Sequence, residues 1–228
     1  MDRCSNLRNF IIRTDPETGD EIHKRLPCKR RGCEPCDRQK ASGMRKDIAR
    51  AAEAHHLQRF VTLTFDPKKI PYGIDPFDYA AVTWGKMRTY LERRYQNHVL
   101  FVRVLELHVS GMPHYHVLVD RFIPVAWLRE AWTAVGGGSQ VDIEFVDVHS
   151  VSGYLAGYIT KQALAGLPRW RRWVTTARGI VLRLKRAPAG WRFNAGYWDE
   201  HLRDLGFPFR FGDGKAAELY EVVLADPP

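Results

Sequence analysis

A pair of histidines separated by one residue is the first feature of the sequence that could do chemistry. His114 and His116 lie in a segment that favours a β-strand, where residues two apart point to the same face. On the preceding strand of the same hairpin, Glu106 and His108 also share a face, and either could reach the same ion. Imidazole and carboxylate ligands with open positions suit Mn²⁺ or Mg²⁺. The hairpin therefore predicts a divalent-metal site, with ordinary surface or core histidines as the alternative.

Two tyrosines and a lysine share one face of a helix expected to run from Ser150 to about Leu164. Tyr154, Tyr158 and Lys161 are spaced by four and three residues, which places them along one side of the helix. An apolar stripe lies about 100° round the helix and can fill the core without the tyrosines. The face is therefore a candidate reactive surface, with amphipathic packing of the tyrosines as the alternative.

A cysteine-rich loop follows the N-terminal hairpin. Cys28, Cys33 and Cys36 have the short spacings of a metal-binding loop, and Cys4 is a candidate fourth thiolate. Four thiolates around zinc form a closed structural site, and a reducing compartment disfavours disulfides. The loop thus predicts a structural zinc site. Basic residues crowd the same loop and are candidate DNA contacts: Lys29, Arg30 and Arg31.

The charge of the chain is concentrated on either side of its middle. The 228 residues carry 35 Lys and Arg against 26 Asp and Glu. Residues 161–198 contain nine basic residues and no acidic one, and residues 21–50 contain ten basic and four acidic residues, whereas 51–160 are nearly neutral. Such clustering indicates a polyanion, with a solvated face as the alternative. Tryptophans in the second run, which could stack on bases, favour single-stranded nucleic acid: Trp170, Trp173, Trp191 and Trp198. The candidate DNA contacts there are Arg169, Trp170, Arg171, Arg172 and Trp173.

The middle of the chain alternates strand and helix patterns in the order β-α-β-β-α-β-α. This order predicts an α+β fold with an antiparallel sheet covered by helices. An N-terminal hairpin is expected around the turn at residues 15–19, and C-terminal strands are expected at 181–184 and 218–224. We expect three regions: a Cys-rich basic segment (1–50), a core (51–165), and a basic, Trp-rich segment (166–228).

The composition excludes several classes of protein. Hydrophobic residues make up 45% and charged residues 27%, the balance of a globular chain and not of a disordered one. No apolar run approaches the roughly 20 residues of a membrane span, and the N-terminus lacks the apolar stretch of a signal peptide. No segment has the spacing of a phosphate-binding P-loop. The sequence therefore predicts a cytoplasmic protein without a membrane partner and without an ATP-driven motor.

The order of three motifs resembles that of HUH endonucleases. The motifs are Phe60-Val-Thr-Leu-Thr-Phe65, Pro113-His114-Tyr-His116 and Tyr154-x3-Tyr158-x2-Lys161. They are most similar to those of the two-tyrosine rolling-circle replication initiators of microviruses and related phages and plasmids. Glu106 with the two histidines resembles the metal motif of single-stranded DNA virus replication proteins, in which the Glu and both histidines bind the ion. The Cys-rich N-terminus also resembles that of microvirus-type initiators.

The resemblance implies a fold and a reaction. The fold would be the HUH/RRM-like Rep fold, and the reaction the nicking of single-stranded DNA at an origin. Tyr154 or Tyr158 would form a 5′-phosphotyrosine link and leave a free 3′-hydroxyl for a polymerase, Lys161 would neutralise charge, and the second tyrosine could rejoin the strand. Such a protein would be phage- or plasmid-encoded, act in the cytoplasm of a bacterial host, and work beside a host polymerase or helicase.

Two alternatives remain open at this point. One is a transposase or relaxase of the same superfamily, which would use similar chemistry to mobilise DNA. The other is a zinc-containing nucleic-acid-binding protein without catalysis, whose tyrosines would stack on bases. The covalent adduct separates the second alternative from the enzymes, and the DNA substrate separates the first from a replication initiator.

Overall fold

The computed structural model describes most of the chain and divides it into two compact units. The described residues are 8–28, 33–96, 98–108, 110–147, 172–182, 190–208, 219 and 221–225. One unit consists of residues 1–42 and 184–228, and the other of residues 43–183. The described ranges contain two antiparallel sheets and four α-helices, which confirms the expected α+β class. The finer division into three regions stays a prediction.

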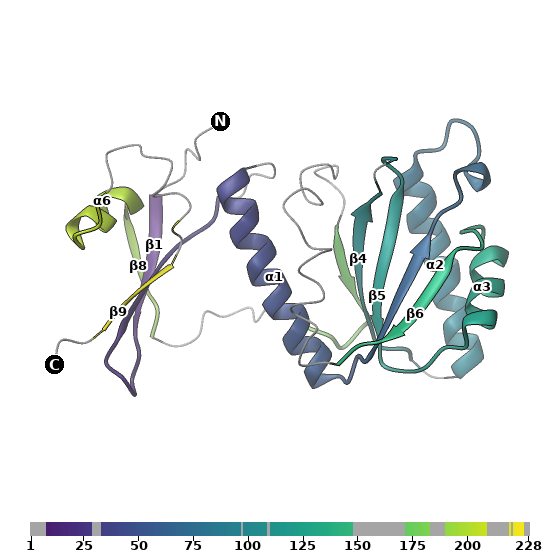
Figure 1. Cartoon of the computed structure of the whole chain (residues 1–228), viewed down its shortest axis with the longest axis horizontal. Helices are drawn as coiled ribbons and strands as arrows, with labels where there is room; N and C mark the ends of the chain where they lie inside the picture. The colour runs from purple at the N-terminus through teal and green to yellow at the C-terminus, as the bar shows by residue number, and fades with distance from the viewer. Residues whose placement is uncertain are drawn as a thin grey trace. The chain divides into compact units, whose positions relative to one another are not determined.

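The unit of residues 43–183 is built on a five-stranded antiparallel sheet (Figure 1). The strands lie in the order β6-β3-β5-β4-β7. Their bounds are β3 (Arg59–Thr64), β4 (Phe101–Leu107), β5 (Pro113–Val119), β6 (Val141–Phe145) and β7 (Val174–Thr176). The central place of β3 and β5 follows from their sequences, because both are rich in apolar, β-branched and aromatic residues that fit a sheet with two packed faces.

Helices α2 (Pro76–Tyr95) and α3 (Val125–Ala134) cover one face of this sheet (Figure 1). Asp75 starts α2, because its carboxylate accepts hydrogen bonds from the backbone N–H groups of Phe77 and Asp78. The helices pack their apolar side chains against alternate residues of the two central strands. These packed residues are Trp84, Met87, Leu91 and Leu128 from the helices, and Val61, Leu63, Val117 and Val119 from the strands.

This packing fixes which strand residues point to the opposite face. Successive side chains of a strand alternate between faces, and a shift of one residue in register would move every side chain to the wrong face. Since the odd-numbered residues of β3 and β5 meet the helices, the even-numbered ones face away from them. Thr62, Thr64, His114 and His116 therefore share the face opposite α2 and α3.

The second unit contains a four-stranded antiparallel sheet in the order β8-β1-β2-β9 and a short helix. Its elements are β1 (Arg8–Thr14), β2 (Glu21–Arg25), β8 (Arg192–Tyr197), α6 (Trp198–Asp204) and β9 (Glu221–Leu224). Phe10, Trp198, Leu202 and Val222 form its apolar core. The expectation that Trp198 stacks on bases is wrong: its side chain is fully buried, and its Nε1 donates a hydrogen bond to the carbonyl of Leu219 at 2.6 Å.

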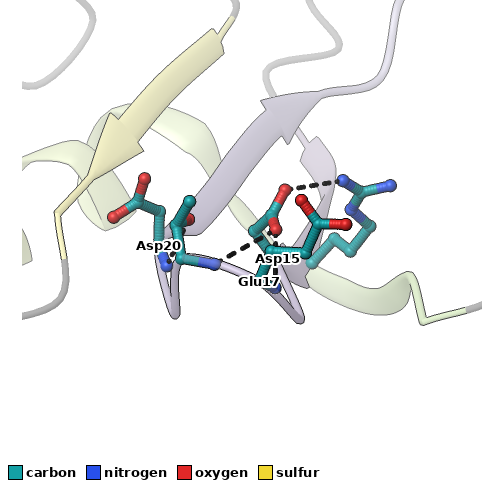
Figure 2. A network of polar contacts seen from close by, with 5 residues as sticks. Asp15, Glu17 and Asp20 are labelled. Atoms are coloured by element: carbon teal, nitrogen blue, oxygen red, sulfur yellow. Dashed lines mark hydrogen bonds and ion pairs between the residues drawn. The ribbon is translucent and has the colours of Figure 1, made fainter.

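The turn between β1 and β2 is the one expected from the sequence (Figure 2). The Asp15 carboxylate accepts hydrogen bonds from the backbone N–H groups of Glu17, at 3.0 Å, and Thr18, at 3.4 Å. The hydrogen bond from Glu17 is the main cause that lowers the pKa of Asp15, and Arg13 at 3.3 Å acts in the same direction. Figure 2 shows Glu17 and Asp20 beside Asp15, at the tip of the hairpin.

Helix α1 (Glu34–Ala54) contains residues of both units, since the boundary between them falls after residue 42. It begins at Glu34, before the expected start at Asp37, because the backbone N–H of Asp37 already donates to the carbonyl of Cys33 at 2.8 Å. No helix in the described part of the chain is both long and apolar enough to span a bilayer.

The C-terminal third departs most from the expected elements. Val181 and Leu182, the described residues of the strand expected at 181–184, lie outside any strand. A strand at Val174–Thr176 instead pairs with β4, and another at Arg192–Tyr197 pairs with β1. The expected strand at 218–224 is present as Glu221–Leu224.

Candidate functional site

Three neighbouring strands bring the predicted metal-binding residues to one region of the sheet. In the register of β3 and β5, Thr62 pairs with His116 and Thr64 with His114. In the register of β4 and β5, Glu106 pairs with His114. The cross-strand pairs therefore place a carboxylate on one side of the histidines and a hydroxyl on the other.

Hydrogen bonds connect both histidines to these neighbours. His116 Nε2 lies 2.8 Å from Glu106 Oε2, and His116 Nδ1 lies 3.4 Å from Thr62 Oγ1. His114 Nδ1 lies 3.2 Å from Thr64 Oγ1. A hydroxyl can either donate or accept, so each threonine suits either tautomer of its imidazole. The threonines thus hold the Nδ1 side of each ring and leave the Nε2 side directed away from β3.

The ring of His116 is fixed by packing as well. It stacks on Phe60, with ring centroids 5.2 Å apart and an interplanar angle of 21°, and its side chain is only 4% exposed. The centroids of His114 and His116 are 4.8 Å apart. A buried, hydrogen-bonded ring loses little further freedom when it binds a ligand, so the two histidines are already positioned for one.

His114 is neutral at physiological pH. Its pKa is lowered from 6.5 to about 4, mainly because burial disfavours the charged imidazolium and also because His116 lies beside it. Glu106 opposes this shift but does not overcome it. Metal ions bind the neutral form of imidazole, so the site presents His114 in the form that a cation requires.

His108 lies just beyond the end of β4, in the turn of the hairpin. Its Nδ1 is 3.1 Å from Ser110 Oγ, and its backbone N–H donates to the carbonyl of Met112 at 2.9 Å. Its ring centroid is 6.4 Å from that of His114. The local turn therefore engages His108, whereas the side chain of Glu106 contacts His116 directly.

Three cysteines gather at the start of α1 in the other unit. The sulfur atoms of Cys28, Cys33 and Cys36 all lie within 4.8 Å of one another, an arrangement that could hold a metal such as zinc. Cys36 joins the cluster from the first turn of α1, and Cys28 follows β2.

Donors around Cys36 suit a negatively charged sulfur. The fully buried Arg25 donates from Nη1 to Cys36 Sγ at 3.2 Å, and the backbone N–H of Cys28 donates to the same sulfur at 3.2 Å. Gln39 Nε2 donates to the carbonyl of Arg25 at 2.5 Å and so helps to fix this strand end. A buried guanidinium favours a thiolate over a thiol, and the thiolate is the form that ligates zinc.

Of the predicted DNA contacts, the structure describes Arg172 and Trp173. Both precede β7, and the carbonyl of Trp173 accepts a hydrogen bond from the backbone N–H of Leu105 at 2.7 Å. They thus lie beside β4, the strand that carries Glu106. The other predicted residues lie outside the described residues: Cys4, Lys29, Arg30, Arg31, Tyr154, Tyr158, Lys161, Arg169, Trp170 and Arg171.

Residues 58–163, the segment that contains β3, the histidine pair and its strands, match the sequence model of a known family. The family is that of the replication-associated protein ORF2. The match confirms the resemblance to rolling-circle Rep-type proteins, covers a little under half of the chain, and supports a role in replication initiation. No curated protein and no solved structure matched the chain.

The threonines of β3 were not predicted as part of the site. The sequence suggested only that Thr62 and Thr64 share a face of a central strand. Their alternation with apolar residues was the available signal, because a polar residue at every second position of a buried strand needs a polar partner. The strand order that makes the histidines those partners could not be derived from local patterns.

Proposed function

We propose that the protein initiates rolling-circle replication by nicking single-stranded DNA with a tyrosine nucleophile. The observation that carries the proposal is the cluster of Glu106, His114 and His116 on one sheet face, within the segment that matches the replication-associated family. The cluster offers two imidazoles and a carboxylate, a donor set that suits Mn²⁺ or Mg²⁺.

These donors fit a divalent cation on the evidence of their own contacts. Glu106 carries the negative charge, His114 is neutral, and both rings are oriented through Nδ1 by threonines. Glu106, His114 and His116 would hold the ion, with His108 as a candidate further ligand. A bound divalent cation would polarise the scissile phosphate and stabilise the negative charge that develops on it.

The tyrosines supply the covalent step in this proposal. The Oη of Tyr154 or Tyr158, after losing its proton, attacks phosphorus and forms a P–O bond. The bond from phosphorus to the 3′ oxygen breaks, and that oxygen takes up a proton to become a free 3′-hydroxyl. Lys161 neutralises charge on the phosphate or tyrosinate. The second tyrosine can repeat the attack at the regenerated junction and rejoin the strand.

The remaining predicted residues have supporting roles. The cysteine cluster, with Cys4 as fourth ligand, would hold a structural zinc ion. The basic residues that flank the core would bind the DNA backbone, with strong salt dependence. They are Lys29, Arg30, Arg31, Arg169, Arg171 and Arg172, with Trp170 and Trp173 stacking on bases.

A cleavage assay tests the metal-dependent reaction. Wild-type protein is incubated with single-stranded oligonucleotides of the replicon that encodes it and Mn²⁺, and both free 3′ ends and a covalent protein–DNA species are measured. His114→Ala should lose cleavage while retaining DNA binding. His98→Ala, a change of an exposed histidine outside the strands, should cleave normally. Full activity of His114→Ala, or of wild type in excess chelator, would reject the metal role.

The same assay decides between the alternatives. Tight binding without any covalent species would indicate a non-catalytic zinc protein. Cleavage at a transposon end or transfer origin, and not at a replication origin, would indicate a transposase or relaxase. Cleavage and a covalent species at the replication origin support the proposal.

A further inference from the structure

A cleft of about 270 Å³ lies at the end of β3, next to the histidine pair. It is lined by Thr64, Phe65, Asp66, Pro67, Lys68, Ser139 and Gln140. Thr64 belongs to both places: it forms part of the cleft wall, and its Oγ1 lies 3.2 Å from His114 Nδ1. A ligand in the cleft would therefore be one residue away from the proposed metal site.

The turn of three glycines before β6 builds one side of the cleft. Gly136 and Gly138 have positive φ angles of 97° and 129°. A Cβ atom at Gly137 would lie 2.0 Å from the ring of Trp132, and one at Gly138 would lie 3.1 Å from the backbone nitrogen of Asp66. Only glycine lets the chain approach this closely, and the approach brings the residues that follow beside Asp66.

Hydrogen bonds hold this turn in a single conformation. The hydroxyls of Tyr79 and Thr133 donate to the carbonyls of Gly136 and Gly138, each at 2.9 Å. The backbone N–H groups of Asp66 and Thr64 donate to the carbonyls of Gly137 and Gln140, at 2.8 and 3.2 Å. The backbone of the cleft is thus committed to the fold, which leaves the side chains to contact a ligand.

Three side chains at the cleft remain available. Lys68, Ser139 and Gln140 are exposed, and none makes a side-chain hydrogen bond or ion pair within the described part of the chain. The Asp66 carboxylate, by contrast, accepts a hydrogen bond from the backbone N–H of Lys68 at 2.9 Å. A primary amide, a hydroxyl and an ammonium group therefore surround a pre-formed hollow.

We propose that this cleft binds one nucleotide of the single-stranded DNA substrate, beside the phosphate that is cut. Gln140, with Ser139, would read the edge of the base, because an amide can donate and accept at the same time. Lys68 would contact a phosphate of the same strand. The inference rests on the proposed function, and it assigns base recognition to the cleft, apart from the metal ligands and the basic flanks.

Selection from a pool of randomised single-stranded oligonucleotides tests the proposal. Selection is done in chelator, so that binding is measured without cleavage. Wild type should select a base at one position, and Gln140→Ala should lose about 5- to 100-fold of that discrimination, as expected for one side chain that reads a base. Gln58→Ala, which alters an exposed glutamine at the opposite end of β3, is the matched control and should keep the preference.

Lys68→Ala provides a second measurement. It should weaken binding of all sequences alike and reduce the salt dependence by about one phosphate contact. Lys86→Ala, on the exposed surface of α2, should change neither. An unchanged base preference in Gln140→Ala, or no preference in wild type, overturns the proposal even if DNA is cleaved. A lost preference in a protein that forms no covalent adduct rejects the proposed function and leaves the cleft assignment standing.

Discussion

His116 Nε2 lies 2.8 Å from Glu106 Oε2, although the residue directly opposite Glu106 in the sheet is His114. The contact is diagonal between two neighbouring strands, so the carboxylate reaches past one imidazole to the other. The two groups that would share a cation already lie within hydrogen-bond distance. The sheet register, and not a flexible loop, keeps them together.

Removing the charge of Glu106 tests its part in metal binding. Glu106→Gln keeps the size of the side chain but replaces an anionic oxygen by an amide. We expect the affinity for Mn²⁺, measured by calorimetry on the intact protein, to fall about tenfold or more, a loss of about 1.4 kcal/mol. Glu130→Gln, on the exposed surface of α3, should leave it unchanged. Equal affinities of the two variants would remove Glu106 from the site.

The threonines of β3 are expected to act through the histidines. Thr62→Val and Thr64→Val keep the shape of the side chain and remove the hydroxyl that meets Nδ1. Loss of such a contact behind a metal-binding imidazole typically costs 10- to 100-fold in metal affinity. Thr62→Ser should restore most of it, because the hydroxyl returns. If the valine variants bind Mn²⁺ as wild type does, the hydrogen bonds have no positioning role.

Much of this arrangement could be predicted from the sequence, and the reason is local. Alternation along a strand placed His114 and His116 on one face, and the short hairpin placed Glu106 beside them. The approach of Thr62 to His116 could not be predicted, because it depends on β3 pairing with a strand about fifty residues later. Sequence spacing describes faces, whereas strand order decides which faces meet.

The cysteine cluster should make the unit of residues 1–42 and 184–228 depend on zinc. Purified protein should contain one zinc ion, and a chelator should lower its Tm. Cys36→Ser should abolish zinc binding, because it removes the sulfur that accepts hydrogen bonds from Arg25 and Cys28. Cys4→Ser tests the fourth ligand and should weaken zinc binding. Full zinc content in Cys36→Ser would show that the cluster is not the site.

His201 should make stability fall in mild acid. Burial lowers its pKa from 6.5, and the neighbouring His23, 2.7 Å away, acts in the same direction. Above about pH 6.5 neither the folded nor the unfolded chain protonates this group. Below it, the unfolded chain binds a proton that the folded chain resists, so the free energy of unfolding decreases as the pH falls.

Denaturant unfolding between pH 7.5 and 5 measures this effect. His201→Gln should flatten the decline in the free energy of unfolding over this range, as expected from the loss of one such group. His56→Asn changes an exposed histidine whose φ of 52° asparagine tolerates, and it should keep the wild-type slope. A variant at His201 that declines as steeply as wild type would contradict this assignment.

Trp198 shows why the C-terminal region was harder to predict. Four tryptophans within a basic run suggested a surface for stacking, but Trp198 is fully buried against Phe10, which lies at the other end of the chain. Likewise β8 pairs with β1 across most of the sequence. Composition indicates a surface only when the residues have no distant apolar partner, and nothing local reveals such a partner.

Identification of the amino acid that carries DNA is the most direct test of the account. After reaction with single-stranded origin DNA and Mn²⁺, the DNA is digested by nuclease and the tryptic peptides are analysed by mass spectrometry. The account predicts a nucleotide on Tyr154 or Tyr158, none in the double Phe variant, and a normal adduct in Tyr72→Phe, a change of a fully exposed tyrosine. An adduct on any other residue, or one that survives in the double variant, would contradict it.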